Sequence, residues 1–247
     1  MSPKRWLAPI LDLEGVARGL SSYAHYWRDW WSYARLPGAE DMLLRNAYPC
    51  LHDRLPSTPV DAHYFYQDWW ASRCIVDSNA ETHVDVGSLV SFVGLLAASV
   101  KVMFVDVRPL LVHLPNLQPV QGDILALPFA RGTIRSISCL HVAEHIGLGR
   151  YGDTLNPAGT RQACAELTRV LAVGGHLYFS VPVGVPRICF NAHRVHSPEQ
   201  ILGYFCDLTL AGFACVDDRG VLHAHAEPSD FSRANYACGL FHLTKES

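Results

Sequence analysis

The chain has few charged residues and no excess of positive charge. Of its 247 residues 17% are charged, and 20 Lys and Arg stand against 23 Asp and Glu, which gives a formal net charge of −3. Proteins that coat nucleic acid are basic, so we expect no nucleic-acid partner. A hydrophobic content of 49% also excludes an intrinsically disordered chain. The length suits one large α/β domain or two small ones.

The sequence also lacks a transmembrane segment, a secretory signal and paired cysteines. Its longest apolar run, residues 92–100, is about half a membrane span. Asp12 and Glu14 interrupt the apolar residues near the N-terminus, so no signal-peptide core forms. The eight Cys are scattered without a C-x-x-C pair, which is typical of buried thiols in a reducing compartment. We therefore expect a soluble cytoplasmic protein.

Three catalytic signatures are missing as well. The chain has no G-x-x-x-x-G-K-[ST] phosphate loop, no G-x-S-x-G nucleophile elbow and no Tyr-x-x-x-Lys pair after the sheet pattern. These absences disfavour P-loop nucleotide hydrolases, α/β-hydrolases and short-chain dehydrogenases.

Aromatic residues are concentrated near the N-terminus. All six Trp lie within the first 70 residues, and six of the ten Tyr within the first 72. Apolar residues spaced by three and four predict an amphipathic helix over 16–34, and a loop-rich stretch over 36–72 follows. We predict that 1–72 form a helical, aromatic-rich cap. A helix that rests on a membrane surface through its arginines is the alternative for 16–34.

From about residue 73 to residue 247 strands alternate with helices, which is typical of a parallel sheet with crossover helices. Helices are expected at 92–99, from Asn156-Pro157 to Gly174-Gly175, and at 198–210; strands are expected at 82–87, 101–106, 120–123, 134–140, 176–181, 214–221 and 236–244. The last two strands have no helix between them and should form a hairpin. The predicted fold is α/β: a Rossmann-like, doubly wound, mostly parallel seven-stranded sheet with an antiparallel last strand.

Informative residues follow four of these strands, at the edge where such sheets bind ligands. Asp85-Val-Gly87-Ser88 follows the first strand, and Asp106 ends the second, 21 residues after Asp85. At that separation a carboxylate meets the ribose diol of a nucleotide-like ligand. Asp123 ends the third strand, and Leu127-Pro128-Phe129 follows closely; this polar-then-apolar pairing suits an adenine amine and ring face. His141-Val-Ala-Glu144-His145 follows Leu140 of the fourth.

These segments resemble the class I S-adenosylmethionine-dependent methyltransferases over about residues 80 to 245. The matching stretches are 122–129, 140–146 and 166–175. The resemblance implies that S-adenosyl-L-methionine binds along the first four strands and that a methyl group passes to a small acceptor. The cofactor-binding residues would be Asp85, Gly87, Ser88, Asp106, Asp123, Ile124 and Leu140.

A narrower resemblance takes in Tyr48-Pro-Cys-Leu51, residues 63–70 and Phe190-Asn-Ala-His-Arg194. It is to a methyltransferase-like family known as a domain of unknown function, whose members resemble products of surface-polysaccharide gene clusters. It implies a role in polysaccharide biosynthesis, with a sugar or sugar nucleotide as the acceptor and its hydroxyl as the methylated group.

The first loop departs from the class pattern. Leu89 and Ser91 stand where the class has glycines, and a Cβ takes space where the backbone approaches the cofactor. A methyltransferase-like binding protein without activity is therefore an alternative.

For an active enzyme, a histidine would take the proton of the acceptor hydroxyl, because its pKa suits that role. His141 is the first candidate, followed by His145 and His193. Arg194 would bind an anionic group of the acceptor. Aromatic faces stack on sugars, so the acceptor-binding residues would include Tyr64, Tyr66, Trp69 and Trp70.

His141-x-x-Glu144-His145 also matches the inverted zinc-protease signature, which needs both histidines on one helical face. Its position at a strand end, with Gly147 and Gly149 close behind, leaves little helix. A zinc hydrolase is thus a further alternative, and we assign no metal ligands.

Overall fold

The computed structural model describes residues 13–246, with side chains of the first helix from residue 22 onward. The chain forms two compact units, Met1–Val60 and Asp61–Ser247. The predicted boundary at residue 72 lies inside a helix of the second unit, α3 (Ala62–Asp77). No helix in the described part of the chain is both long enough and apolar enough to cross a bilayer.

The first unit contains the predicted amphipathic helix, α2 (Leu13–Tyr33), and a short 3₁₀ turn, η1 (Leu44–Asn46). Aromatic rings cluster along α2: the Trp27 centroid lies 5.3 Å from that of Tyr26 and 5.9 Å from that of Trp30. Trp27 and Trp31 remain exposed, at 39% and 57%.

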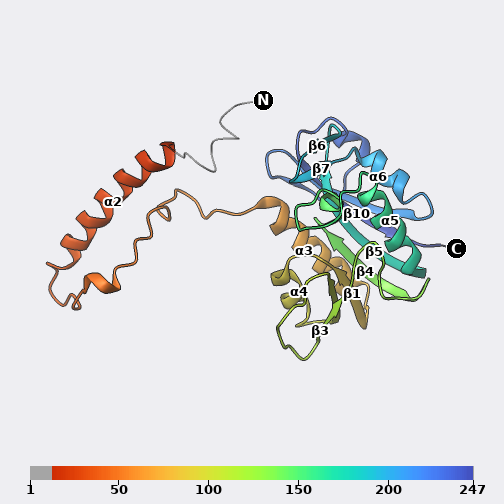
Figure 1. Ribbon diagram of the computed structural model, residues 1–247, viewed down its shortest axis with the longest axis horizontal. Coiled ribbons are helices and arrows are strands. Elements are labelled where there is room, and N and C mark those ends of the chain that lie inside the picture. Colours follow the sequence, from red (N-terminus) through yellow and green to blue (C-terminus); the bar gives the residue numbers. More distant parts are fainter. Residues whose placement is uncertain (1–12, 247) are drawn as a thin grey trace. The chain divides into compact units, whose positions relative to one another are not determined.

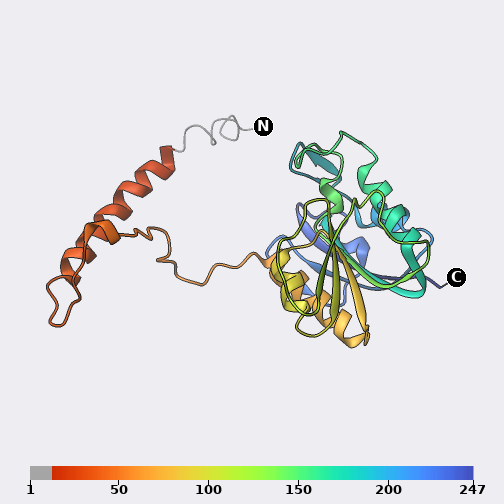
Figure 2. The ribbon, with the colours of Figure 1, turned by 60° about the horizontal axis from the view of Figure 1, so that its bottom comes forward.

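The second unit is built on one twisted sheet with the strand order β3-β2-β1-β4-β5-β10-β8-β9 (Figures 1 and 2). Neighbours from β3 to β5 are parallel, and β10 runs antiparallel between β5 and β8. The predicted fold is confirmed, and β9 adds a short eighth strand. The strands are β1 (Thr82–Val86), β2 (Lys101–Asp106), β3 (Leu117–Gln121), β4 (Ile134–Leu140), β5 (Leu171–Val183), β8 (Thr209–Val216), β9 (Leu222–His223) and β10 (Ala237–Thr244). A separate hairpin pairs β6 (Arg187–Cys189) with β7 (His193–Val195).

Helices cover both faces of the sheet. On one face α3 and α4 (Val90–Leu96) pack into a cluster that includes Tyr178. On the other face α5 (Gly159–Val170) and α6 (Pro198–Tyr204) pack into a cluster that includes Phe179. Successive strand residues point to opposite faces, so Tyr178 and Phe179 of β5 join the two layers to one sheet.

Several element boundaries differ from the prediction. The expected loop over 36–72 is wrong from residue 62, because α3 begins there: the Asp61 carboxylate accepts the N–H of His63 at 3.0 Å and caps the helix. Helix α5 begins at Gly159, since the side chain of Asn156 instead orders the preceding turn by accepting the N–H of Ala158. Strand β5 starts directly after α5, so Gly174-Gly175 lies within the strand.

Candidate cofactor and acceptor site

A pocket of about 220 Å³ opens at the carboxyl ends of β1, β2 and β4. Right-handed crossovers bring these strand ends together, which is where ligands of doubly wound sheets bind. Four of the seven predicted cofactor-binding residues line it: Gly87, Ser88, Asp106 and Leu140. Tyr64, His141 and His145 border the same pocket. We call it the rim pocket.

Asp85 orders the first loop from beneath the rim pocket. Its carboxylate is fully buried and accepts hydrogen bonds from the Ser88 backbone N–H at 3.1 Å and the Ser88 hydroxyl at 2.7 Å, and from the Ser138 hydroxyl. Burial raises the pKa of Asp85 to about 6 although these bonds oppose the shift. The residue predicted to touch the cofactor therefore shapes the loop that borders it.

The loop needs a glycine at one position. Gly87 has φ +71°, and a Cβ there would lie 3.1 Å from Cγ1 of Val142. Leu89 ends the loop in extended conformation before α4; it is 41% exposed and lines the rim pocket. The leucine therefore occupies the mouth of the pocket, which a glycine there would leave open.

The other two predicted carboxylates differ in position. Asp106 lines the rim pocket, and Arg108 covers it: its backbone N–H donates to Asp106 Oδ1 at 2.8 Å and its guanidinium to both oxygens at 3.2 and 3.3 Å. Asp123 is exposed and accepts the N–H of Leu125, while Ile124 is buried. Neither Asp123 nor Ile124 is among the residues that line the pocket.

His141 adopts a strained conformation immediately after β4, with φ +53°. Its Nδ1 lies 2.5 Å from Oε1 of Gln67, which also accepts the Ser180 hydroxyl. Its Nε2 is buried and has no hydrogen-bond partner among residues 22–246. Burial lowers the pKa of His141 to about 3, so the ring is neutral near pH 7. Sequence reasoning missed Gln67, although the spacing Gln67, Ala71, Ile75 marks the buried face of α3.

Glu144 is fully buried, and neither carboxyl oxygen has a hydrogen-bond partner in the described part of the chain. Burial raises the pKa of Glu144 to about 8. His145 Nδ1 lies 2.6 Å from the Ala192 carbonyl oxygen, which can only accept, so Nδ1 carries the proton. The lone pair of His145 Nε2 then faces Oε1 of Glu144 at 3.5 Å.

The zinc-hydrolase alternative required a helix here, and the structure shows a single 3₁₀ turn, η2 (Ala143–His145). The two histidines of the motif are therefore not presented on one helical face. Among the described residues, the His, Cys and acidic side chains whose ligand atoms converge within 4.8 Å of one another are His63, His141 and Cys238. The signature is not formed as a zinc site.

The predicted acceptor residues separate into different surroundings. The Tyr64 ring lies 5.4 Å from that of His141 at the rim pocket. Tyr66 and Trp70 pack against the sheet beneath α3, and Trp69 is 48% exposed with Arg73 over its ring at 5.7 Å. Tyr236, which the sequence did not single out, lies by the rim: its ring is 5.4 Å from His63 and 5.0 Å from the predicted base His193.

The comparisons with known proteins agree with this architecture. NodS, an N-methyltransferase from Bradyrhizobium japonicum WM9 solved with S-adenosyl-L-homocysteine, superposes with a TM-score of 0.55 at 16% identity, covering 81% of this chain and 92% of NodS. The [4+2]-cyclase SpnF superposes with a TM-score of 0.55 at 13% identity, covering 73% of this chain and 80% of SpnF. The fold is thus that of the class I S-adenosylmethionine-dependent methyltransferases.

Residues 131–218 match a family model described as Caenorhabditis protein of unknown function, DUF268. This segment carries η2, α5, β5 and β7. No curated protein matches the chain. SpnF, named for a cyclisation, shows that the fold by itself does not fix the reaction, so the function has to be argued from the site.

Proposed function

We propose that the protein is an S-adenosylmethionine-dependent methyltransferase that methylates a hydroxyl group of a small molecule or sugar. The observation that carries the proposal is the rim pocket itself. It joins a glycine turn at the end of β1 to a carboxylate at the end of β2, in a fold whose relatives include a structure with S-adenosyl-L-homocysteine. A glycine turn admits a ligand close to the backbone, and a carboxylate suits a ribose diol.

The residues of the rim pocket fit this cofactor after a side-chain movement. Ligand pockets usually measure about 300–1,000 Å³, and the rim pocket is smaller because Leu89, Arg108 and Arg150 border it. Arg108 and Arg150 are exposed, and turning them out of the pocket breaks only exposed hydrogen bonds, to Asp106 and to the Ala192 carbonyl oxygen, and contacts with the Tyr151 ring. When bound, S-adenosylmethionine supplies an electrophilic sulfonium methyl group. Asp106 would accept hydrogen bonds from the ribose hydroxyls. The wall of the pocket would be formed by Gly87, Ser88 and Leu140.

The proposed reaction also requires a group that takes the proton of the acceptor hydroxyl. Methylation of a hydroxyl group releases its proton, so the site needs a base among the protein's own residues. Of the predicted bases, His141 binds protons weakly because its pKa is about 3. Burial raises the pKa of Glu144 to about 8, so this fully buried carboxyl is protonated near pH 7 and cannot take the proton. We assign the base to His145, which lines the rim pocket and keeps a lone pair on Nε2 because its Nδ1 donates to the Ala192 carbonyl oxygen.

The acceptor side would be bounded by His141, His193, Tyr64 and Tyr236. Aromatic faces suit a sugar ring, and the resemblance to polysaccharide-cluster proteins is in line with that class. The eight cysteines, all within the described residues, are free thiols, which supports a cytoplasmic location.

The test is a calorimetric titration with S-adenosylmethionine and S-adenosylhomocysteine. We expect both to bind, and Asp106→Ala to weaken each about tenfold or more, because a charge-assisted hydrogen bond is lost. Asp207→Ala, which removes an exposed carboxylate from the same unit, is the matched control. Absence of binding at millimolar concentration would remove the proposal and leave the fold. Binding without methyl transfer to any hydroxyl acceptor would favour the inactive binding protein.

A further inference from the structure

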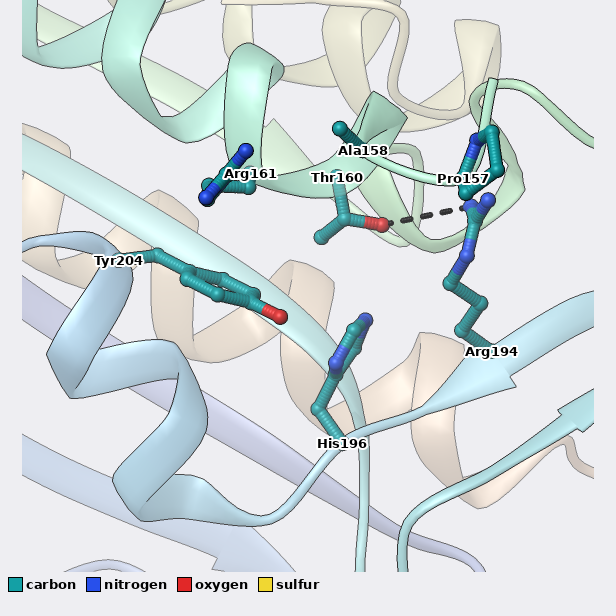
Figure 3. A pocket seen from close by; sticks show the side chains of 7 residues that line it. All are labelled: Pro157, Ala158, Thr160, Arg161, Arg194, His196 and Tyr204. Atoms are coloured by element: carbon teal, nitrogen blue, oxygen red, sulfur yellow. Dashed lines mark hydrogen bonds between the residues drawn. The ribbon is translucent and has the colours of Figure 1, made fainter.

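A second pocket, of about 310 Å³, adjoins the turn that carries Glu144. It lies between the first turn of α5, the end of β7 and Tyr204 of α6 (Figure 3). Arg194 links it to the candidate site, since its guanidinium donates to the carbonyl oxygen of Ile146 at 2.6 Å, next to η2. We call it the α5 pocket.

Arg194 brings a buried positive charge to the α5 pocket. Its side chain belongs to a residue only 5% exposed, and its hydrogen-bond partners are neutral oxygens, among them the carbonyl of Asn156 at 3.0 Å. It forms no ion pair with any residue in the described range. The carboxylate of Asp153 acts on it only through space, because that carboxylate accepts the N–H groups of Gly147 and Tyr151. A buried cation without a partner is costly.

His196 supplies a buried ring nitrogen without a hydrogen-bond partner among residues 22–246. It is 7% exposed, and its Nε2 has no hydrogen-bond partner in the described structure. Figure 3 shows its ring pointing from the end of β7 toward Thr160 and Arg194. Burial and the nearby Arg194 charge lower the pKa of His196 to about 4, so the ring is neutral near pH 7 and offers one N–H. An oxyanion next to Nε2 selects the tautomer with the proton on Nε2 and gives this buried nitrogen a partner.

The first turn of α5 adds further donors. Its cap residue is Ala158, which has no side-chain oxygen, and the turn contains no acidic residue. Free N–H groups and the helix dipole make such an end attractive to anions. Arg161 stands in this turn, exposed and without an ion pair among residues 22–246. Every charged side chain that lines the pocket is therefore positive.

We propose that the α5 pocket binds an oxyanion, the phosphate or carboxylate of a small molecule, through Arg161, His196 Nε2–H and the first turn of α5. The buried charge of Arg194 favours the same ligand. That this anion belongs to the methyl acceptor rests on the proposed function. Oxyanion binding itself does not, and it can be measured without S-adenosylmethionine.

The experiment compares the thermal stabilisation of the full chain by inorganic phosphate with that by chloride at equal ionic strength. A ligand that binds the folded state raises its melting temperature in a concentration-dependent way. We expect saturable stabilisation by phosphate. Arg161→Gln and His196→Gln should each weaken the apparent phosphate affinity, the first by about tenfold because it removes a charged donor. Arg135→Gln, on exposed β4 surface, makes the same charge change and should leave it unchanged.

Acetate and glucose 1-phosphate, titrated in the same way, identify the source of the anion. Tighter binding of the sugar phosphate than of inorganic phosphate supports an anion carried by the acceptor, and preference for acetate supports a carboxylate. Equal stabilisation by phosphate and chloride overturns the proposal, as does phosphate binding that both pocket variants leave intact. Because S-adenosylmethionine binding is measured separately at Asp106, the failure of one proposal is distinguishable from the failure of the other.

Discussion

The two halves of the rim differ in how their polar groups are satisfied. After β1 and β2, each carboxylate already has donors: Ser88 and Ser138 for Asp85, and Arg108 for Asp106. After β4, the Nε2 atom of His141 and both oxygens of Glu144 are buried without partners in the described structure. Buried polar groups normally find partners, so unpaired ones need an explanation. The β1–β2 half is preorganised by its own side chains, whereas under the proposed function the β4 half is completed by its ligand.

Removing residues 62–71 of α3 should break this comparison most severely. A chain that starts at Ser72 lacks Gln67 and Ala71, which are fully buried, and we expect it to lose cooperative thermal unfolding. A chain that starts at Asp61 keeps the helix cap and should retain its melting transition within a few degrees, measured by circular dichroism. If the shorter chain unfolds at the same temperature as the longer one, α3 is not part of the core.

Glu144→Gln should remove a pH-dependent destabilisation. Burial raises the folded-state pKa of Glu144 from 4.5 to about 8, so between these values the folded state holds the proton more tightly and stability falls as pH rises. Above pH 8 the full penalty, a few kcal/mol, is present. We expect urea denaturation to show the variant more stable than the parent at pH 8.5, with little difference at pH 4.5.

Asp85→Asn is the matched comparison from the satisfied half of the rim. The pKa of Asp85 rises from 3.8 to about 6, so its penalty develops at lower pH and is smaller. A Glu144→Gln variant whose stability tracks the parent between pH 4.5 and pH 8.5 would show that the Glu144 carboxyl is paired or solvated in solution.

The sheet could be predicted from the sequence, and four of the seven predicted cofactor-binding residues line the rim pocket. The strands could be predicted because their apolar runs end at or just before Gly87, Asp106 and His141. Helix α3 could not be predicted from the spacing of apolar residues, because polar and aromatic residues surround its buried positions Gln67, Ala71 and Ile75. Which carboxylates face a ligand depends on partners far away in the chain, such as Ser138 for Asp85. The lack of hydrogen-bond partners for Glu144 in the described structure likewise cannot be predicted from a motif that matches a zinc site.

Gln67→Ala tests a hydrogen-bond partner that holds the His141 ring in the β4 half. The change leaves Nδ1 of His141 and the hydroxyl of Ser180 without their shared acceptor. Leaving a buried group unsatisfied costs about 1–3 kcal/mol, and we expect a loss of that size in urea denaturation. Gln118→Ala, at an exposed position of β3, should change stability by less than about 0.5 kcal/mol. Equal effects of the two substitutions would show that Gln67 does not hold His141.

The smallest expected effect on stability comes from removing the arginine that covers the Asp106 carboxylate in the β1–β2 half. Arg108 is exposed, so its pair with Asp106 contributes less than about 1 kcal/mol to stability, and Arg108→Gln should leave the melting temperature nearly unchanged. The same pair competes with ribose hydroxyls for the Asp106 oxygens. Its removal should therefore tighten S-adenosylmethionine binding by a few fold in calorimetry, with Asp106 still oriented by the backbone N–H of residue 108. Weaker binding would mean that Arg108 contacts the cofactor itself, and the β1–β2 half would then also be completed by its ligand.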